Sequence, residues 1–137
     1  LEQGRNAMMT PFGAVLGESG TREAVAYVQQ LSGQTADPEM AAAGEKHFKT
    51  ICMACHGMDG KGMAILGSAN LADSIYRFVP EGDQSVLDSV KYTIMHGVND
   101  VSDPNTREAI MPAFGERLPP GEIKKLAVYV HKLGGGQ

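Results

Sequence analysis

Both cysteines of the chain lie in a single pentapeptide, Cys52-Met53-Ala54-Cys55-His56, which has the spacing C-x-x-C-H. Two thiols three positions apart at the start of a helix lie on one side of a turn, where they can add to the two vinyl groups of a haem. The histidine that follows is then placed beneath the iron as its proximal ligand. The motif therefore predicts one covalently bound haem c, anchored by Cys52 and Cys55 and ligated by His56.

Other uses of a C-x-x-C pair fit this chain less well. A structural zinc site needs four ligands, normally from two such pairs, and the chain has one pair. A thioredoxin-like motif would be flanked by a βαβ pattern, which the sequence does not show. A plain disulfide between Cys52 and Cys55 would leave His56 without a role.

The second iron ligand decides what such a haem can do. A haem held by His56 alone would be open to small molecules, whereas a second protein ligand would make it an electron carrier. Met111 is the favoured candidate: it lies 55 residues after His56 and directly before Pro112, which biases it toward an extended backbone. His96 is the alternative, and most other methionines are too near His56 or lie in predicted helices.

The composition is that of a single domain with an appendage. Of 137 residues, 42% are hydrophobic but only 6% are aromatic, and none is Trp, so a buried haem would supply apolar volume that the core lacks. The net charge of −4 argues against nucleic acid or anionic lipid as partners.

The start of the chain and the haem motif suggest a cellular location. The chain begins at Leu1 rather than Met, has no signal-peptide pattern, and has no apolar run near the ~20 residues that span a bilayer. Bacteria attach haem to cysteines outside the cytoplasm. We therefore expect a periplasmic piece of a longer protein, whose anchor in the inner membrane precedes this segment.

Helix signals dominate, and the sequence predicts an all-α fold around the haem. One helix begins at Asp37-Pro38 and runs into the motif, a second is capped by Asp83 or Ser85, and the last runs from Pro119-Pro120 to Gly134. The glycine-rich stretch 57–62 and the polar stretch 99–105 are predicted loops. This order of helices is that of a class I cytochrome c, in which we expect Gly44 and Phe48 to face Tyr129.

The chain also contains an internal repeat. Residues 7–33 match residues 109–135 at a constant offset of 102, with nine identities: Ala7, Met9, Phe12, Gly13, Leu16, Tyr27, Val28, Leu31 and Gly33. We therefore expect residues 1–36 to be the end of a preceding cytochrome c domain plus a linker, and residues 37–137 to be a cytochrome c domain. Met9 or Met8 would then be an orphaned ligand, and the remnant's apolar face would favour self-association. The alternative is that residues 21–31 are only a linker helix.

Several motifs together resemble a known family. They are Gly44-Glu45-x-x-Phe48, the C-x-x-C-H run with Gly57-x-Asp59-Gly60-Lys61-Gly62, Asn70-Leu71, Met111-Pro112-Ala113-Phe114 and the segment Leu126 to Val130. They are similar to the second haem domain of the CcoP/FixP subunit of cbb3-type cytochrome c oxidases. The resemblance implies haem contacts from Asn70 and from Arg77 or Arg107.

The same resemblance implies electron transfer. The domain would take electrons from a soluble cytochrome c or another periplasmic donor and pass them toward the oxygen-reducing core subunits, without catalysis of its own. Two other functions stay open at this point. One is a stand-alone or dehydrogenase-fused cytochrome. The other is a haem sensor or peroxidase with an open iron site.

Overall fold

The structure, a computed structural model, describes residues 1–79, 82 and 84–134. Asp83 and Gly135, which the sequence analysis uses as a cap and as a match of the repeat, lie outside these residues. The chain forms two compact units: Ala7–Glu108, here the large unit, and Leu1–Asn6 with Ala109–Gln137, here the small unit.

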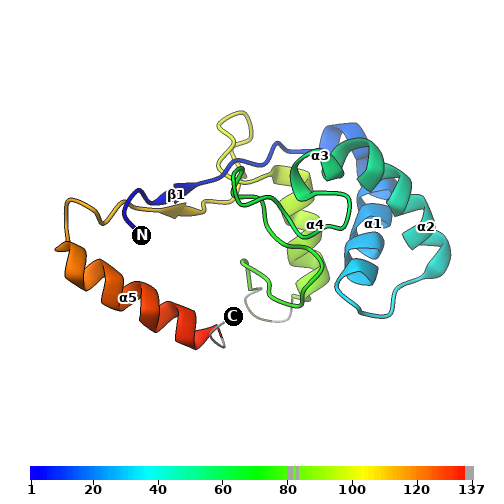
Figure 1. The fold of residues 1–137 in the computed structure, drawn as a ribbon. Coiled ribbons are helices and arrows are strands. Elements are labelled where there is room, and N and C mark those ends of the chain that lie inside the picture. Colours follow the sequence, from blue (N-terminus) through cyan, green and yellow to red (C-terminus); the bar gives the residue numbers. More distant parts are fainter. Residues whose placement is uncertain (80–81, 83, 135–137) are drawn as a thin grey trace. The chain divides into compact units, whose positions relative to one another are not determined.

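The helices confirm the predominantly helical fold predicted from the sequence (Figure 1). The large unit contains α1 (Gly13–Leu31), α2 (Pro38–His47), a π-helical turn η1 (Phe48–Cys52), α3 (Met53–His56) and α4 (Val86–His96). The small unit contains β1 (Arg5–Asn6), β2 (Ile110–Met111) and α5 (Pro120–Leu133).

Helix α2 begins where the sequence predicts. The Asp37 carboxylate accepts hydrogen bonds from the backbone N–H groups of Glu39 (3.0 Å) and Met40 (2.9 Å), and Pro38 occupies the first helical position. The path then continues through η1 into α3. The haem motif therefore lies at the C-terminal end of one helical segment.

Helix α4 has a complete capping box. The Ser85 hydroxyl accepts from the Asp88 N–H (3.1 Å), and the Asp88 carboxylate accepts from the Ser85 N–H (3.0 Å). The helix ends before Gly97, as predicted. Of the two predicted caps, Ser85 is thus the one that the structure shows.

Helix α1 packs inside the large unit, beside α2 (Figure 1). Its buried residues are Gly20, Thr21, Ala24, Val25, Ala26 and Val28, and Ala24 and Val25 form a core cluster with Ile94 of α4. The expectation that residues 1–36 leave an apolar face exposed is therefore wrong, because α2 and α4 cover that face. The predicted domain boundary at residue 36 stays a prediction.

The contact between α1 and α2 is close at one glycine. A Cβ atom on Gly44 would overlap the backbone carbonyl of Glu23, so only glycine allows this approach. One turn along, the ring of Tyr27 packs on Phe48, with 5.2 Å between centroids. The residue that the structure places on Gly44 and Phe48 is thus Tyr27, whose counterpart in the repeat is the expected Tyr129.

The small unit is held together by backbone pairing. Strands β1 and β2 are antiparallel, with Arg5 opposite Met111, and the Phe114 N–H donates to the Leu1 carbonyl (3.1 Å). Helix α5 begins at Pro120 and is followed by Gly134, as predicted. Several of its apolar side chains are exposed, namely Leu126, Val128, Tyr129, Val130 and Leu133.

Among the described residues, no helix combines the length and apolar character that crossing a membrane requires.

Candidate haem site

The two cysteines lie one helical turn apart at the motif. Cys52 is the last residue of η1, and Cys55 and His56 close the single turn of α3. Both cysteines are free thiols, and Cys52 is half-buried while Cys55 is exposed. In this structure they are therefore not joined in the disulfide that was the alternative. Two free thiols at this spacing on one side of a turn are what attachment to the two vinyl groups of a haem requires.

Burial raises the pKa of the Cys52 thiol, and the neighbouring Cys55 raises that pKa further. The protonated thiol is therefore the favoured form of Cys52. Among the residues that the structure describes, no group of three His, Cys, Asp or Glu side chains is arranged to hold a metal ion.

The imidazole of His56 is held by one hydrogen bond. Its Nδ1 lies 2.9 Å from the carbonyl oxygen of Ala69, and because a carbonyl only accepts, Nδ1 carries the proton. In the neutral ring, Nε2 is then the atom with a free lone pair. This partner fixes both the tautomer and the orientation, as the outer partners of metal-ligating histidines do. His56 therefore fits the role of proximal iron ligand.

The loop after α3 supplies that carbonyl. Ser68 ties the loop to the motif: its hydroxyl donates to the carbonyl of Cys55 (2.5 Å) and accepts from the N–H of Met63 (2.8 Å). Gly62 has φ +76°, and a Cβ there would contact the carbonyls of Ser68 and Ala69. The glycine-rich sequence is thus needed for the loop to fold back and place Ala69 beside the histidine.

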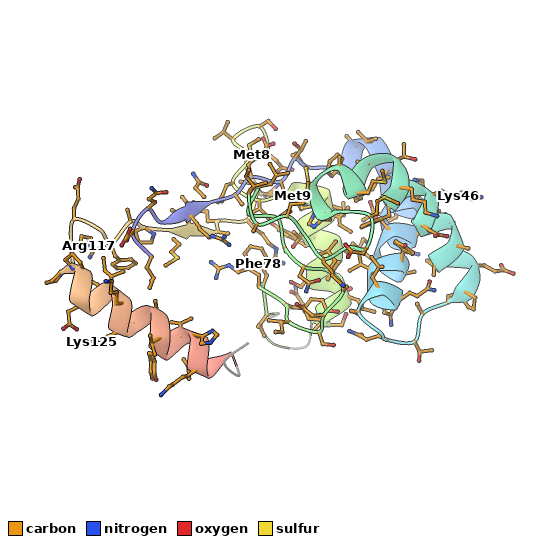
Figure 2. The ribbon with its side chains drawn as sticks, in the orientation of Figure 1. Met8, Met9, Lys46, Phe78, Arg117 and Lys125 are labelled. Carbon is orange, nitrogen blue, oxygen red and sulfur yellow. The ribbon has the colours of Figure 1, made fainter. Side chains whose placement is uncertain are left out.

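Met9 lies on the extended segment that leads into α1 (Figure 2). It belongs to the same compact unit as His56. Its backbone exchanges two hydrogen bonds of 2.9 Å with Val98. Its side chain is partly buried and packs on the core cluster around Ile94, whereas Met8 is 67% exposed. Of the two methionines that the repeat points to, Met9 is therefore the one held in the core.

Met111 lies in β2 of the small unit, where its backbone is opposite Arg5. The other predicted site residues, Cys52, Cys55, His56, Asn70, Arg77 and Arg107, all belong to the large unit. The structure therefore places the predicted pair of iron ligands on different units.

Arg107 lies between two aromatic rings. Its guanidinium carbon is 4.6 Å from the centroid of Phe78 and 4.7 Å from that of Tyr92, and one terminal nitrogen donates to the Ser89 hydroxyl (3.0 Å). Its Nε is buried and, among the described residues, has no hydrogen-bond partner. An orphaned N–H of this kind fits an anionic group that is part of the complete molecule, such as a haem propionate.

The other two tentative haem contacts have local roles. The Asn70 side chain accepts a hydrogen bond from the backbone N–H of Ala72 (2.9 Å), which stabilises a turn. The guanidinium of Arg77 lies 6.0 Å from the Phe78 ring, farther than that of Arg107. Of the two arginines, Arg107 thus makes the closer contact with the Phe78 ring.

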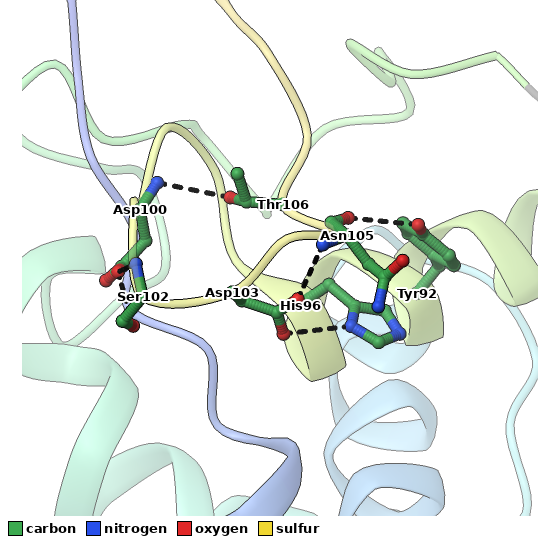
Figure 3. A network of polar contacts seen from close by, with 7 residues as sticks. All are labelled: Tyr92, His96, Asp100, Ser102, Asp103, Asn105 and Thr106. Carbon is green, nitrogen blue, oxygen red and sulfur yellow. Dashed lines mark hydrogen bonds and ion pairs between the residues drawn. The ribbon is translucent and has the colours of Figure 1, made fainter.

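His96, the alternative iron ligand, is tied into the polar loop after α4 (Figure 3). Its Nδ1 lies 3.0 Å from the Asp103 carboxylate, and its ring packs on Tyr92, with 4.5 Å between centroids. The backbone N–H of Asn105, together with His96, holds the pKa of Asp103 below its ordinary value. His96 thus has a structural role in ordering this loop.

Sequence reasoning missed two features of this site. It did not predict that α1 packs on α2. The repeat indicates that residues 7–33 and 109–135 are alike, but it does not say which of the two stretches packs on α2. Sequence reasoning also missed the aromatic pair Phe78 and Tyr92 around Arg107. No motif marks that pair, since the three residues come from three separate segments.

Comparison with known proteins gives a consistent result. A family model described as "Cytochrome C oxidase, cbb3-type, subunit III" matches residues 39–130. The cbb3-type cytochrome c oxidase subunit FixP of Azorhizobium caulinodans is 39% identical over 99% of this chain and 42% of its own length. The CcoP subunit of Cereibacter sphaeroides is 36% identical over 99% of this chain and 43% of its own length. The chain thus spans about two fifths of the length of these relatives.

Proposed function

The chain belongs to the family of cbb3-type cytochrome c oxidase subunit III and has a class I cytochrome c fold, and from this premise we propose how it transfers electrons. It carries one haem c, bound covalently through Cys52 and Cys55 and ligated by His56 and Met111. When bound, the haem supplies a one-electron iron couple. The observation that carries the proposal is the hydrogen bond from His56 Nδ1 to the Ala69 carbonyl, which leaves Nε2 free as an iron ligand.

Each protein group has a defined part in this site. Cys52 at the end of η1 and Cys55 in α3 would hold the haem covalently, and the Ala69 carbonyl keeps the imidazole of His56 in one orientation. Met111 supplies a thioether, a soft ligand that favours the reduced iron and raises the potential relative to two histidines. Support for Met111 comes from its sequence position before Pro112. Little needs to rearrange when the electron arrives, because both ligands serve both oxidation states.

Arg107 is proposed to hold a propionate through its buried Nε. The two rings that sandwich its guanidinium keep that N–H in place, so its orientation does not depend on the haem. Asn70 and Arg77 stay proposed haem contacts. The Asn70 side chain also accepts a hydrogen bond that stabilises a turn, and the guanidinium of Arg77 lies near the Phe78 ring.

The chain's partners are proposed from its relatives. FixP and CcoP are named as subunits of an oxidase, so this domain would pass electrons toward oxidase core subunits and not reduce oxygen itself. Its donor would be a soluble cytochrome c or another redox protein of the periplasm, and the complete protein would be anchored in the inner membrane. The repeat supports the further proposal that residues 1–36 end a preceding cytochrome c domain.

Two measurements on the haem-loaded chain test this function. After denaturation and solvent extraction the haem should stay on the polypeptide, and a variant with Cys52→Ala and Cys55→Ala should release it. The oxidised protein should show sulfur-to-iron charge-transfer absorption, and the reduced protein should resist carbon monoxide at neutral pH. Ready binding of carbon monoxide would instead indicate an open iron site, as in a sensor or peroxidase, and would overturn the proposal.

A further inference from the structure

Residues 1–6, here the N-terminal segment, pair with the stretch that carries Met111, and both belong to the small unit. Strand β1 runs antiparallel to β2, with Arg5 opposite Met111 and Asn6 opposite Ile110. Successive side chains of a strand point to opposite faces, and Ile110 is 60% exposed while Met111 is half-buried. A slip of this pairing by one residue would exchange the two faces, so the pairing decides which face Met111 occupies.

The pairing continues beyond Pro112, which interrupts the ladder because proline has no backbone N–H group. The N–H of Phe114 donates to the carbonyl of Leu1 (3.1 Å), and the N–H of Gly115 donates to the carbonyl of Glu2 (3.0 Å). The N-terminal segment therefore holds the backbone on both sides of this proline.

The closest approach between the two stretches is at Gly4. This residue has φ +69°, a conformation that other residues rarely adopt, and a Cβ atom there would overlap the backbone carbonyl of Met111 and the backbone nitrogen of Ala113. Glycine is thus required at this position for its conformation and for its lack of a side chain. The carbonyl that it accommodates is that of Met111 itself.

We propose that the N-terminal segment is a positioning segment for the distal iron ligand, because it holds the backbone of Met111 in one conformation before the thioether binds the haem iron. A stretch that is already ordered loses less conformational entropy when its side chain binds. This inference rests on the proposed ligation by His56 and Met111. It adds that residues 1–36, proposed above to end a preceding cytochrome c domain, contribute to ligand binding in the domain that follows.

The test compares Gly4→Ala with the matched control Gly17→Ala in the haem-loaded chain. Gly17 also has a positive φ, +64°, but a Cβ there meets no atom within 4 Å, so the control carries the backbone strain without the overlap at Met111. In the reduced protein, Gly4→Ala should bind carbon monoxide on the order of tenfold faster than the unchanged chain, since overpacking of ordinary size shifts an equilibrium by about that factor. Gly17→Ala should resist carbon monoxide as the unchanged chain does.

The outcomes separate this inference from the proposed function. Equal rates in Gly4→Ala and Gly17→Ala, whether slow or fast, would overturn the inference and leave the His/Met function intact. Absence of the sulfur-to-iron absorption from the unchanged oxidised chain would overturn the His/Met function and the inference with it. If Gly4→Ala does not take up haem, Gly115→Ala replaces it, because its Cβ would lie 3.0 Å from the carbonyl oxygen of Glu2 and strain the same pairing less severely.

Amide hydrogen exchange tests the pairing itself. The N–H groups of Phe114 and Gly115 should exchange faster in Gly4→Ala than in the unchanged chain, and at an unchanged rate in Gly17→Ala. Faster binding of carbon monoxide without faster exchange at these two amides would overturn the proposal, because Met111 would then be loosened while the N-terminal segment stayed paired.

Discussion

At the scale of single residues, the site depends on how three side chains are held before any haem contacts them. His56 is oriented by the Ala69 carbonyl, Cys52 by its place at the end of a helical turn, and Arg107 by the rings of Phe78 and Tyr92. Each partner is a backbone group or an aromatic ring that does not titrate near neutral pH. The orientation of these three side chains therefore does not depend on the titration of a partner.

A prediction at this scale concerns the charge of Arg107. Arg107→Gln removes a positive charge that disfavours the oxidised iron, so the midpoint potential should fall. If the charges of Arg107 and the oxidised iron interact by about 1 kcal/mol, loss of that interaction lowers the midpoint potential of a one-electron couple by about 40 mV. Redox titration of the haem-loaded chain measures this shift. Arg22→Gln is the control, because Arg22 makes an exposed ion pair with Glu18 on α1, and the potential of this variant should match that of the parent. Equal potentials in all three proteins would contradict the proposed propionate contact.

At the scale of elements, the attachment helix is fixed at both ends by local sequence and in the middle by its neighbour. Asp37 and Pro38 start α2, and the turn of α3 ends at Gly57. Between them, α1 approaches at Gly44 so closely that the backbones touch. This close packing orients the motif relative to the rest of the large unit.

The prediction for this contact is that Gly44→Ala destabilises the chain. Alanine gains about 1 kcal/mol of helix propensity over glycine, but its Cβ forces α1 outward, and such overpacking costs about 1–3 kcal/mol. We expect a net loss in the free energy of unfolding, measured by urea denaturation. The control is Gly121→Ala on α5, where a Cβ meets no atom within 4 Å and only the gain in propensity should appear. If Gly44→Ala were as stable as Gly121→Ala, the observed packing of α1 on α2 would be contradicted.

At the scale of the whole molecule, the distribution of apolar surface differs from what the repeat suggested. Residues 1–36 were expected to expose an apolar face, yet α1 buries Ala24, Val25 and Val28 inside the large unit, while α5 of the small unit has several exposed apolar side chains. Val128 is 56% exposed, Tyr129 61% and Leu133 69%. Self-association through the remnant stays a prediction, and the exposed apolar side chains make α5 a second surface to test for it.

Sedimentation of the chain at increasing concentration tests this prediction. The average mass should rise with concentration, and Val130→Asp should reduce the rise because a charge on the apolar face of α5 opposes its burial. Val15→Asp is the matched control: Val15 is 71% exposed on α1, and the substitution changes the net charge equally. A reduction of the same size in both variants, or a constant mass at all concentrations, would contradict a role for α5.

Local sequence was sufficient to predict much of this molecule. The C-x-x-C-H run predicts its cofactor from five adjacent residues, and the caps Asp37, Ser85 and Pro119 predict where helices begin. These predictions succeed because the interactions span only a few residues, so that their chemistry is complete within the segment.

Two features were decided only by the tertiary structure. The sandwich around Arg107 joins residues from separate segments, and no periodicity links them. The packing of α1 on α2 could not be predicted from the repeat, because residues 7–31 and 109–133 share Met, Tyr and Leu at equivalent positions. The two stretches differ at other positions: Glu23 accepts a hydrogen bond from His47 of α2, and its counterpart is Lys125, which cannot accept one.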